Sequence, residues 1–303
     1  TSNGLTGTIP TRIGVMKSLT SFAAAYNSLA GTVPAEIGLL SNIKWLYLSH
    51  NSITGRLPNE LGNVTKLSAL AMSYNKLTGS IPTAYAVLTA LRKVDLSANN
   101  INGSLPSEIG SLYKIAFLDL SANSLSMSLP DSFALMTKLN NLDISLNQLS
   151  GVVSENFWSG MEYMNFLDLH SNSFSGSVGS GVCNMWMMYY LDLSDNQFSH
   201  SIPGCVWDFD LSDILLNNNY FTGPVDSVDT SDLTRIFIRY NQFSGTFPST
   251  ILNSQSLTVL AMDQNQFHGV LDDVGNAPNL QIFQAANNLF SGTFPVSITK
   301  LTT

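Results

Sequence analysis

Apolar residues recur along this chain in a fixed pattern about 24 residues long. Each copy places them eight, five and three positions before an asparagine, as Ile43, Leu46 and Leu48 stand before Asn51. The last two alternate with their neighbours, which predicts a short β-strand with one buried face. Another apolar residue follows two positions after the asparagine. The pattern therefore predicts a strand and then a turn in every copy.

The asparagine returns thirteen times, at intervals of 22 to 25 residues. These ladder asparagines are Asn3, Asn27, Asn51, Asn75, Asn99, Asn123, Asn147, Asn172, Asn196, Asn219, Asn241, Asn265 and Asn288. Such a period over a whole chain predicts a solenoid, because each copy can bury its apolar side only against its neighbours. Parallel strands from successive coils would stack ~4.8 Å apart. We expect residues 1–303 to form one domain.

Each ladder asparagine has a structural role in this interpretation. A coil that turns inside the core strands backbone N–H and C=O groups away from water, and an amide side chain can donate to and accept from them. Glycine follows four residues later in eleven of the thirteen copies, with Met127 and His200 as exceptions, and proline follows seven residues later in nine. Glycine permits a tight bend, and proline fixes φ.

The run from Leu91 to Pro106, LRKVDLSANNINGSLP, resembles the plant-type leucine-rich repeat, LxxLxxLxLxxNxLxGxIP. The resemblance extends over the entire chain. It implies an α/β solenoid, a curved right-handed superhelix of about thirteen coils with a parallel concave sheet. Members of this family are mostly extracellular receptor ectodomains, receptor-like proteins and inhibitors. They usually carry cysteine-paired caps, which this sequence lacks, so we expect a fragment of a longer solenoid.

Charge argues against several classes of partner. Charged residues make up only 11% of the chain and the net charge is −8, so nucleic acid and anionic membranes are poor partners. No apolar run reaches the roughly 18 residues that span a bilayer. We expect no metal and no cofactor, because zinc and redox motifs are missing.

Two features favour secretion. Cys183 and Cys205 fall in adjacent coils nearly in register, so we expect them to lie close enough for a disulfide in an oxidising compartment; whether they form it stays open. The triplets that begin at Asn63 and Asn102 match the N-glycosylation sequon. Both features predict an extracellular or cell-surface location.

Five consecutive copies carry aspartate four residues before the ladder asparagine. These are Asp95, Asp119, Asp143, Asp168 and Asp192. This position faces outward on the concave side, and carboxylates stacked at one strand spacing repel one another and raise some pKa values. One interpretation is a stripe that binds a cation or a cationic partner. The other is structural, with Asp and Ser hydrogen-bonded across coils.

His170 lies two residues after Asp168 on the same face, and Ser145 and Ser194 hold its position in the flanking copies. Ser, His and Asp together are the residues of nucleophilic catalysis. The sequence has no GxSxG motif and indicates no oxyanion hole. We therefore expect no enzymatic activity and keep His170 as a candidate ligand contact.

Aromatic residues supply two further candidates for partner binding. Phe117, Phe166 and Tyr190 stand six positions before the ladder asparagine, beside the aspartates, where they either contact a ligand or pack on the sheet surface. Trp158, Trp186 and Trp207 fall where the repeat is least regular, which marks either a partner site or relaxed core packing.

The family resemblance predicts a non-catalytic extracellular recognition or adhesion module that binds protein or glycan. One alternative is a structural subunit of an extracellular assembly such as a wall, sheath or filament. A further alternative is ice binding, because Ser or Thr recurs three and five residues after most ladder asparagines and could form a flat hydroxyl array.

Overall fold

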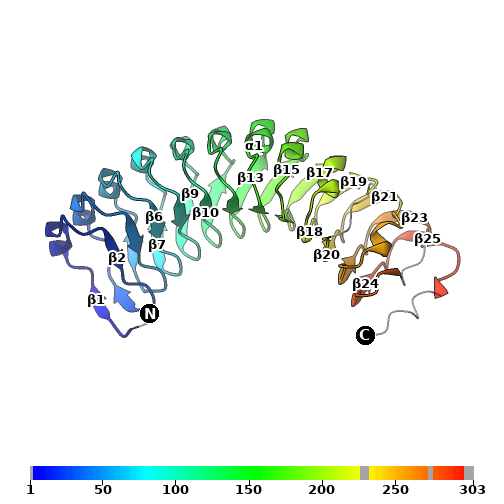
Figure 1. The fold of residues 1–303 in the computed structure, drawn as a ribbon, viewed down its shortest axis with the longest axis horizontal. Coiled ribbons are helices and arrows are strands. Elements are labelled where there is room, and N and C mark those ends of the chain that lie inside the picture. The colour runs from blue at the N-terminus through cyan, green and yellow to red at the C-terminus, as the bar shows by residue number, and fades with distance from the viewer. Residues whose placement is uncertain (1–2, 226–231, 272–275, 297–303) are drawn as a thin grey trace. The chain divides into compact units, whose positions relative to one another are not determined.

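The computed structural model describes residues 3–225, 232–271 and 276–296. The chain divides into two compact units, Thr1–Ser150 (unit 1) and Gly151–Thr303 (unit 2). Each unit is a stack of coils, with strands along one side and short helices along the opposite side (Figure 1). The predicted solenoid with a parallel sheet is confirmed in both units.

The main sheet of each unit takes one three-residue strand from each coil. In unit 1 the order is β2 (Ser21–Ala23), β4 (Trp45–Tyr47), β6 (Ala69–Ala71), β8 (Lys93–Asp95), β10 (Phe117–Asp119) and β12 (Asn141–Asp143). In unit 2 it is β14 (Phe166–Asp168), β16 (Tyr190–Asp192), β18 (Asp213–Leu215), β20 (Arg235–Phe237), β22 (Val259–Ala261) and β24 (Ile282–Gln284). The middle residue of most strands is buried, so the first and third residues form the open face of the sheet.

A second parallel sheet follows the ladder asparagines, which the sequence did not predict. In unit 1 it comprises β5 (Thr54–Arg56), β7 (Lys76–Gly79), β9 (Asn100–Gly103), β11 (Ser124–Met127) and the start of β13 (Gln148–Val152), besides the pair β1 (Thr6–Thr8) and β3 (Ser28–Ala30). In unit 2 it comprises β15 (Ser173–Gly176), β17 (Gln197–His200), β19 (Tyr220–Gly223), β21 (Gln242–Thr246), β23 (Gln266–Val270) and β25 (Leu289–Ser291). The bend in these strands needs a positive φ, which Gly79 supplies at +76° and which Met127 adopts at +71° without being glycine.

The helices are shorter than an α/β description implies. Unit 1 has the 3₁₀ helices η1 (Thr11–Val15), η2 (Ala35–Leu39), η3 (Asn59–Asn63), η4 (Thr83–Val87), η5 (Ser107–Ser111) and η6 (Asp131–Leu135). Unit 2 has the α-helix α1 (Glu155–Gly160) and the 3₁₀ helices η7 (Ser180–Asn184), η8 (Gly204–Asp208) and η9 (Ile251–Asn253). In unit 1 a proline precedes each helix with φ between −67° and −74°, so the recurrent proline sets the entry into the helix.

The ladder asparagine binds adjacent coils together, as the sequence predicted. The side-chain nitrogen of Asn99 donates to the carbonyl oxygens of Met72, Leu96 and Ser97 at 3.0–3.1 Å, and its oxygen accepts from the N–H of Leu77 at 2.9 Å. The same four bonds recur at Asn51, Asn75, Asn123, Asn147 and Asn196, among others. Without them, buried backbone groups would lose their partners.

Unit 2 adds an aromatic column to this core. Phenylalanine takes the apolar place two residues after the ladder asparagine, and consecutive rings stack 6.0–6.4 Å apart at Phe174, Phe198, Phe221, Phe243, Phe267 and Phe290. Stacked rings at this spacing contribute both apolar burial and ring–ring attraction. The core of unit 2 is therefore continuous from coil to coil along this column.

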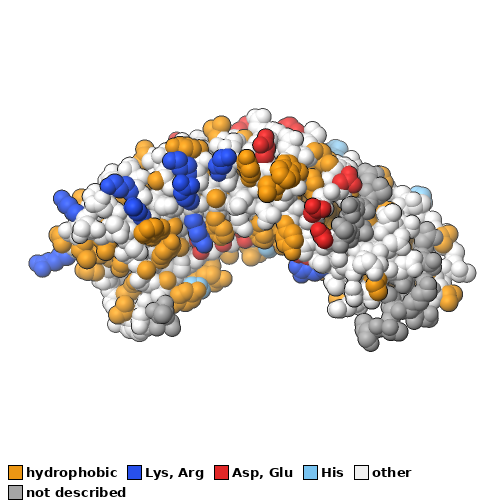
Figure 2. All heavy atoms as spheres, in the orientation of Figure 1, with side chains coloured by type: hydrophobic (Ala, Val, Ile, Leu, Met, Phe, Trp, Pro, Cys, Tyr) orange, Lys and Arg blue, Asp and Glu red, His pale blue; other side chains and the backbone are white. Residues whose placement is uncertain are grey.

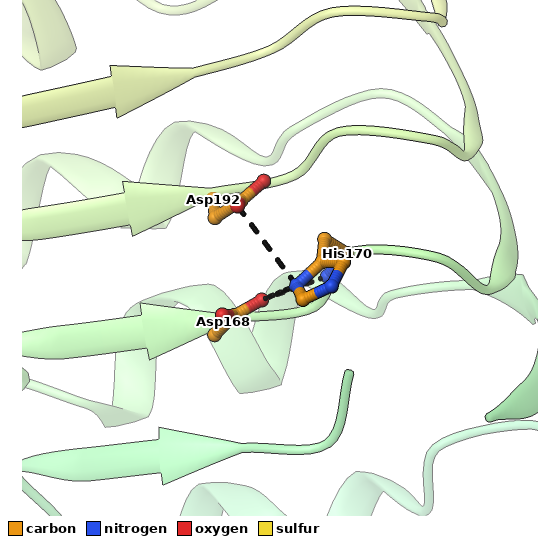
Figure 3. Close-up of side chains that lie close together, drawn as sticks. All are labelled: Asp168, His170 and Asp192. Carbon is orange, nitrogen blue, oxygen red and sulfur yellow. Dashed lines mark hydrogen bonds and ion pairs between the residues drawn. The ribbon is translucent and has the colours of Figure 1, made fainter. Parts of the chain in front are cut away.

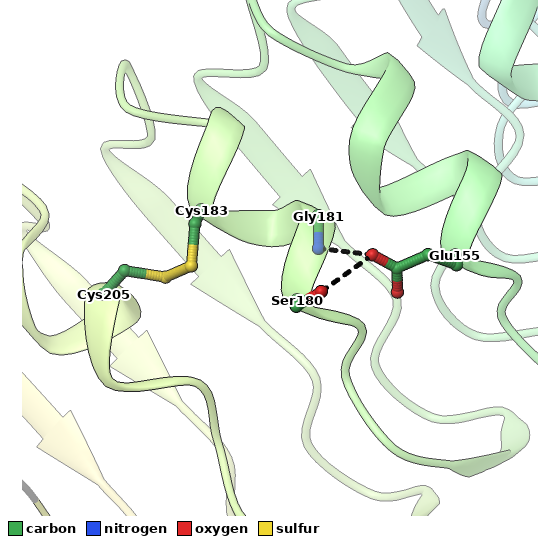
Figure 4. Close-up of a disulfide and its surroundings, with 5 residues drawn as sticks. All are labelled: Glu155, Ser180, Gly181, Cys183 and Cys205. Carbon is green, nitrogen blue, oxygen red and sulfur yellow. Dashed lines mark hydrogen bonds between the residues drawn. A yellow bond between two sulfur atoms is a disulfide. The ribbon is translucent and has the colours of Figure 1, made fainter.

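The coil of α1 lacks the proline and holds its neighbour by a carboxylate instead. Oε1 of Glu155 accepts from the N–H of Gly181 at 2.6 Å and from Oγ of Ser180 at 3.1 Å (Figure 4). A Cβ at residue 179 would meet both the carboxylate of Glu155 and the buried ring of Trp158, whose Cδ1 would lie 2.6 Å away, which explains glycine at that position. Beside this contact, Cys183 in η7 and Cys205 in η8 form a disulfide with a Cα separation of 5.6 Å.

We expect Asn99→Ala to lower the free energy of unfolding by about 2–4 kcal/mol, because it removes four hydrogen bonds of a buried side chain. Urea denaturation followed by circular dichroism measures the loss. Asn100→Ala is the matched control, since Asn100 is exposed, and it should change stability by less than ~0.5 kcal/mol. Equal effects of the two substitutions would contradict the structural role of the ladder.

Replacing Cys183 and Cys205 together with alanine should lower the free energy of unfolding by about 3 kcal/mol. The disulfide closes a 22-residue loop, so breaking it adds conformational freedom to the unfolded chain. Thermal unfolding with and without reductant gives the comparison. Reductant should destabilise the natural chain and leave the double variant unchanged; a natural chain insensitive to reductant would argue against the bond.

Candidate ligand-binding site

The structure places the predicted surface residues on the open faces of the two main sheets. In unit 1 the strands β8, β10 and β12 end with Asp95, Asp119 and Asp143, and Phe117 begins β10. In unit 2 the strands β14 and β16 carry Phe166, Asp168, Tyr190 and Asp192, and His170 follows β14 by two residues. Register pairs Phe166 with Tyr190 and Asp168 with Asp192. Each unit therefore has its own group of candidate residues.

Each aspartate first serves its own turn. In β10, Oδ1 of Asp119 accepts from the backbone N–H of Ser121 at 3.0 Å and from its hydroxyl at 2.7 Å. The same pair of bonds joins Asp95 to Ser97, Asp143 to Ser145 and Asp192 to Ser194. The Asp–Ser bonds anticipated from the sequence thus exist, but most of them lie within one coil. Ser73 makes an exception, since its hydroxyl donates to Asp95 of the next coil at 2.9 Å.

Burial raises the pKa of two aspartates above the usual value of 3.8. For Asp119 the cause is desolvation, opposed by the hydrogen bonds from Ser121 and increased by the charge of Asp95. For Asp192 desolvation comes first and the charge of Asp168 second, while the bonds from Ser194 and the nearby His170 lower the pKa. Repulsion between stacked carboxylates, which the sequence predicted, is therefore present but smaller than the effect of burial.

The densest cluster of ionisable groups lies in unit 2. Nδ1 of His170 is 2.6 Å from Oδ1 of Asp168 and 3.8 Å from Oδ2 of Asp192 (Figure 3). Both carboxylates are buried, with 6% and 5% of their residue surfaces exposed, while His170 remains partly exposed. The imidazole therefore bridges two carboxylates at the floor of the open face, and a protonated imidazole would neutralise part of their charge.

The donor types of this cluster could also hold a metal ion, since one imidazole nitrogen and two carboxylate oxygens lie within 4.8 Å of one another. One oxygen of each carboxylate is engaged within the protein, since Oδ1 of Asp168 accepts from the backbone and ring of His170 and Oδ1 of Asp192 accepts from Ser194. The hydroxyl of Ser194 donates to Asp192 at 2.6 Å rather than to the imidazole. The aspartates therefore form a hydrogen-bonded cluster with His170 and Ser194 in which Ser194 is bonded to a carboxylate and not arranged as a nucleophile.

An aromatic pair and an ion pair border the cluster. The rings of Phe166 and Tyr190 stack 4.4 Å apart at an interplanar angle of 6°, and the Tyr190 hydroxyl lies 3.3 Å from Oδ2 of Asp192. Burial, followed by the charges of Asp192 and Asp168, raises the pKa of Tyr190 above its usual range. On the next two strands Nε of Arg235 donates to Oδ1 of Asp213.

The partner of Arg235 was missed at the sequence level. Asp213 stands six residues before its ladder asparagine, not four, so it falls outside the aspartate stripe although register places it beside Tyr190. A second ion pair follows, with Nη2 of Arg239 3.4 Å from Oδ2 of Asp263. Comparing every outward position between coils would have found both pairs.

For two of the three tryptophans the partner-site interpretation is wrong and the alternative, core packing, is what the structure shows. Trp158 is fully buried, with its ring edge-on to Phe157 at 5.3 Å, and Trp207 is 2% exposed and packs edge-on against Phe243 at 6.4 Å. The helices α1 and η8 direct these rings into the core. The irregular spacing of the repeat did not show this burial. Trp186 alone of the three is open to solvent, at 66%.

The hydroxyl edge, meaning the Ser and Thr residues three and five positions after the ladder asparagines, is occupied in part by local bonds. The hydroxyls of Thr54 and Thr78, three residues after their ladder asparagines, donate to the carbonyl oxygens of Gly31 and Gly55 in the preceding coils. The sequon residue Asn102 takes this same place in its coil and is exposed, as is Asn63 at the end of η3. Both sequons therefore lie where a glycan could be attached.

Comparison with known proteins decides the family. The Leucine Rich Repeat family model matches residues 42–64, 90–112, 114–136 and 188–209. Receptor-like protein 35 of Arabidopsis thaliana is 32% identical over 143 residues, which cover 46% of this chain and 15% of that protein. The crystal structure of a TDR receptor superposes with a TM-score of 0.94 and 29% identity over 99% of this chain and 52% of that one.

This chain is a plant-type leucine-rich-repeat protein. Its similarity is to receptor ectodomains, which agrees with the prediction that it is not an enzyme. The leucine-rich-repeat chain spans about half the length of that receptor structure and a much smaller part of the curated relatives.

Two further structures bear on what such a protein binds. The plant peptide hormone receptor RGFR1 in complex with RGF2 superposes on all of the leucine-rich-repeat chain and 57% of its own, with a TM-score of 0.82 and 25% identity. A plant ice-binding protein superposes with a TM-score of 0.67 and 29% identity over 74% of this chain and 72% of that one. Within the described residues, no helix is both long enough and apolar enough to cross a bilayer.

Replacing Asp192 with asparagine should change how stability depends on pH. The pKa of Asp192 is higher in the folded chain than the usual value of 3.8, so the folded chain holds this proton more tightly than the unfolded chain does. This proton binding stabilises the folded state fully below pH 3.8, and the stabilisation is lost as the pH rises through the folded pKa. Asparagine has no such titration, so the variant should gain stability relative to the natural chain across this interval. Urea titrations at a series of pH values measure the difference. A difference that stays constant, or falls as the pH rises, would contradict the assignment.

Proposed function

We propose that this protein is an extracellular recognition module that binds a peptide or a protein segment on the open face of strands β14–β20. The single observation that carries the proposal is the grouping in unit 2 of a stacked aromatic pair, a buried acidic cluster and an ion pair on neighbouring strands. Such a face offers apolar contact and charge together, as protein-binding surfaces do.

The chemistry of this face favours a basic and partly apolar ligand. Asp168, Asp192 and Asp213 present three carboxylates, of which Asp213 pairs with Arg235 and the other two share one imidazole. A lysine or arginine side chain of the ligand would add the positive charge that His170 supplies only when protonated. The Phe166–Tyr190 pair beside them would take an apolar side chain or a cation against its rings.

Three observations support placement outside the cell. The disulfide between Cys183 and Cys205 suits an oxidising compartment. The receptor-like relatives and receptor structures are of the same repeat type. The sequon residues Asn63 and Asn102 are exposed, and we infer that they carry glycans.

Because the repeat runs through both units, we further infer one leucine-rich-repeat domain over residues 1–303.

Ice binding is a second candidate, favoured by the likeness to the plant ice-binding protein. The hydroxyl edge weakens it, because Thr54 and Thr78 use their hydroxyls on neighbouring coils. A glycan on Asn102 would also stand within the row of hydroxyls. Thermal hysteresis, measured on the glycosylated protein and on the Asn102→Gln protein, distinguishes ice binding from peptide recognition. A structural role in an assembly would instead appear as concentration-dependent association in light scattering.

A random-sequence peptide library, selected on the immobilised chain, tests the recognition proposal. We expect enriched peptides to combine a basic residue with an apolar one. Phe166→Ala with Tyr190→Ala should weaken their binding about tenfold or more, because an aromatic anchor at an interface contributes ~2 kcal/mol. Trp186→Ala is the control, since it removes an exposed ring away from this face. Peptides that bind the double variant as well as the natural chain would contradict the proposal.

A further inference from the structure

The two units carry opposite charge. Residues 1–150 contain ten Lys and Arg and seven Asp and Glu, a net charge of +3, whereas residues 151–303 contain three and fourteen, a net charge of −11. Together these give the −8 of the whole chain. The net charge of −8, from which we expect nucleic acid and anionic membranes to be poor partners, therefore averages two unlike surfaces.

Positive charge recurs from coil to coil in unit 1. One cation lies in the loop between the helix and the next strand of the main sheet in each of six successive coils. These residues, which we call the basic strip, are Lys17, Lys44, Lys66, Arg92, Lys114 and Lys138. All six are exposed. Figure 2 shows Lys and Arg side chains following one another over the part of the molecule that Figure 1 colours blue to green.

The acidic residues of unit 1 lie on other surfaces. Glu36, Glu60, Glu108 and Asp131 occupy the first turns of η2, η3, η5 and η6. Asp95, Asp119 and Asp143 end strands on the open face of the sheet. These seven are all the acidic residues of unit 1, so the loops of the basic strip carry positive charge alone.

Polar and aromatic groups accompany the strip. Nζ of Lys66 donates to Oδ1 of Asn42 at 2.7 Å, and Nδ2 of Asn42 donates to the carbonyl oxygen of Lys17 at 2.9 Å, which links three coils along the strip. The ammonium group of Lys114 lies 5.4 Å from the ring of Tyr113, which is 49% exposed. Lys44 lies 5.9 Å from the ring of the exposed Trp45.

From this arrangement we propose that the basic strip binds an acidic polysaccharide, a linear chain of uronic-acid residues. Each coil contributes one exposed cation, so the positive charge runs along the direction in which the coils stack, as a linear polyanion laid across the coils requires. Carboxylates on the sugar ring would pair with the cations, and the apolar faces of the sugars would lie against Tyr113 and Trp45. This surface is separate from the peptide-binding face proposed for unit 2.

A linear polymer fits the strip better than a membrane does. Each loop contributes one cation along the stack of coils, whereas attraction to a lipid surface grows with the number of cations that can reach a plane. The disulfide suits the oxidising compartment outside the cell, away from nuclear and cytosolic nucleic acid. Anionic lipid and nucleic acid are therefore competing outcomes of the test.

Isothermal titration with an oligomer of 1,4-linked uronic acid, long enough to span six coils, tests the proposal. We expect binding that weakens as salt rises, and little binding of the methyl-esterified oligomer, which is neutral. Lys66→Gln, Arg92→Gln and Lys114→Gln together should weaken binding about tenfold, since each exposed ion pair contributes up to ~1 kcal/mol. Thermal unfolding checks that the variant folds.

The matched control changes the net charge equally but away from the strip, by Arg12→Gln, Arg56→Gln and Lys76→Gln in η1, β5 and β7. It should retain most of the binding. Equal losses in the two triple variants would overturn the proposal, because they would indicate attraction to net charge rather than to the strip. The proposal would also be overturned if the oligomer did not bind, whether or not the chain bound phosphatidylserine vesicles or duplex DNA. None of these results bears on the peptide-binding face.

Discussion

The structure depends on how the buried backbone of each turn is satisfied. A coil of about 24 residues cannot close around an apolar core unless its inward carbonyl and N–H groups find partners. The ladder asparagine supplies them from one side chain, and in doing so it bonds to its own coil and to the preceding one. The requirement is identical in every coil, so the residue returns at a fixed interval and the strands are brought into register. The outward side chains on the open face of the main sheet therefore lie in the same register.

Register turns a repeated sequence into an ordered surface. Outward positions that are 22 to 25 residues apart in the chain become neighbours, so Phe166 stacks on Tyr190 and Asp168 lies beside Asp192. The aspartates then have two effects. Each closes its own turn through Ser or His, which stabilises the coil. Each also places a carboxylate at the sheet surface, and desolvation by burial, followed by the charge of a neighbouring aspartate, raises the pKa of Asp119 and Asp192. The same residue type thus serves the fold and gives the surface its charge.

Much of the fold could be predicted from the sequence because its determinants are local and repeated. The apolar positions, the asparagine and the proline before each helix have one meaning in every coil. The second sheet was not foreseen, because its strands are only three to five residues long and contain at most one buried side chain, as Lys76–Gly79 does at Leu77. Trp158 and Trp207 were misjudged because their burial depends on how α1 and η8 turn, which spacing alone leaves open. Of the candidate site, the aromatic and aspartate columns were visible, whereas the Asp213–Arg235 pair formed where the period shifts by one or two residues.

The central claim is that the open face of unit 2 is where this leucine-rich-repeat protein recognises its ligand. Hydrogen–deuterium exchange of the chain with and without a selected peptide tests it most directly. The account predicts slower exchange in the peptide-bound chain for the segments around β14, β16 and β18, with no change in the helices η7 and η8 on the opposite side of the coils. Protection confined to those helices or to unit 1 would contradict it.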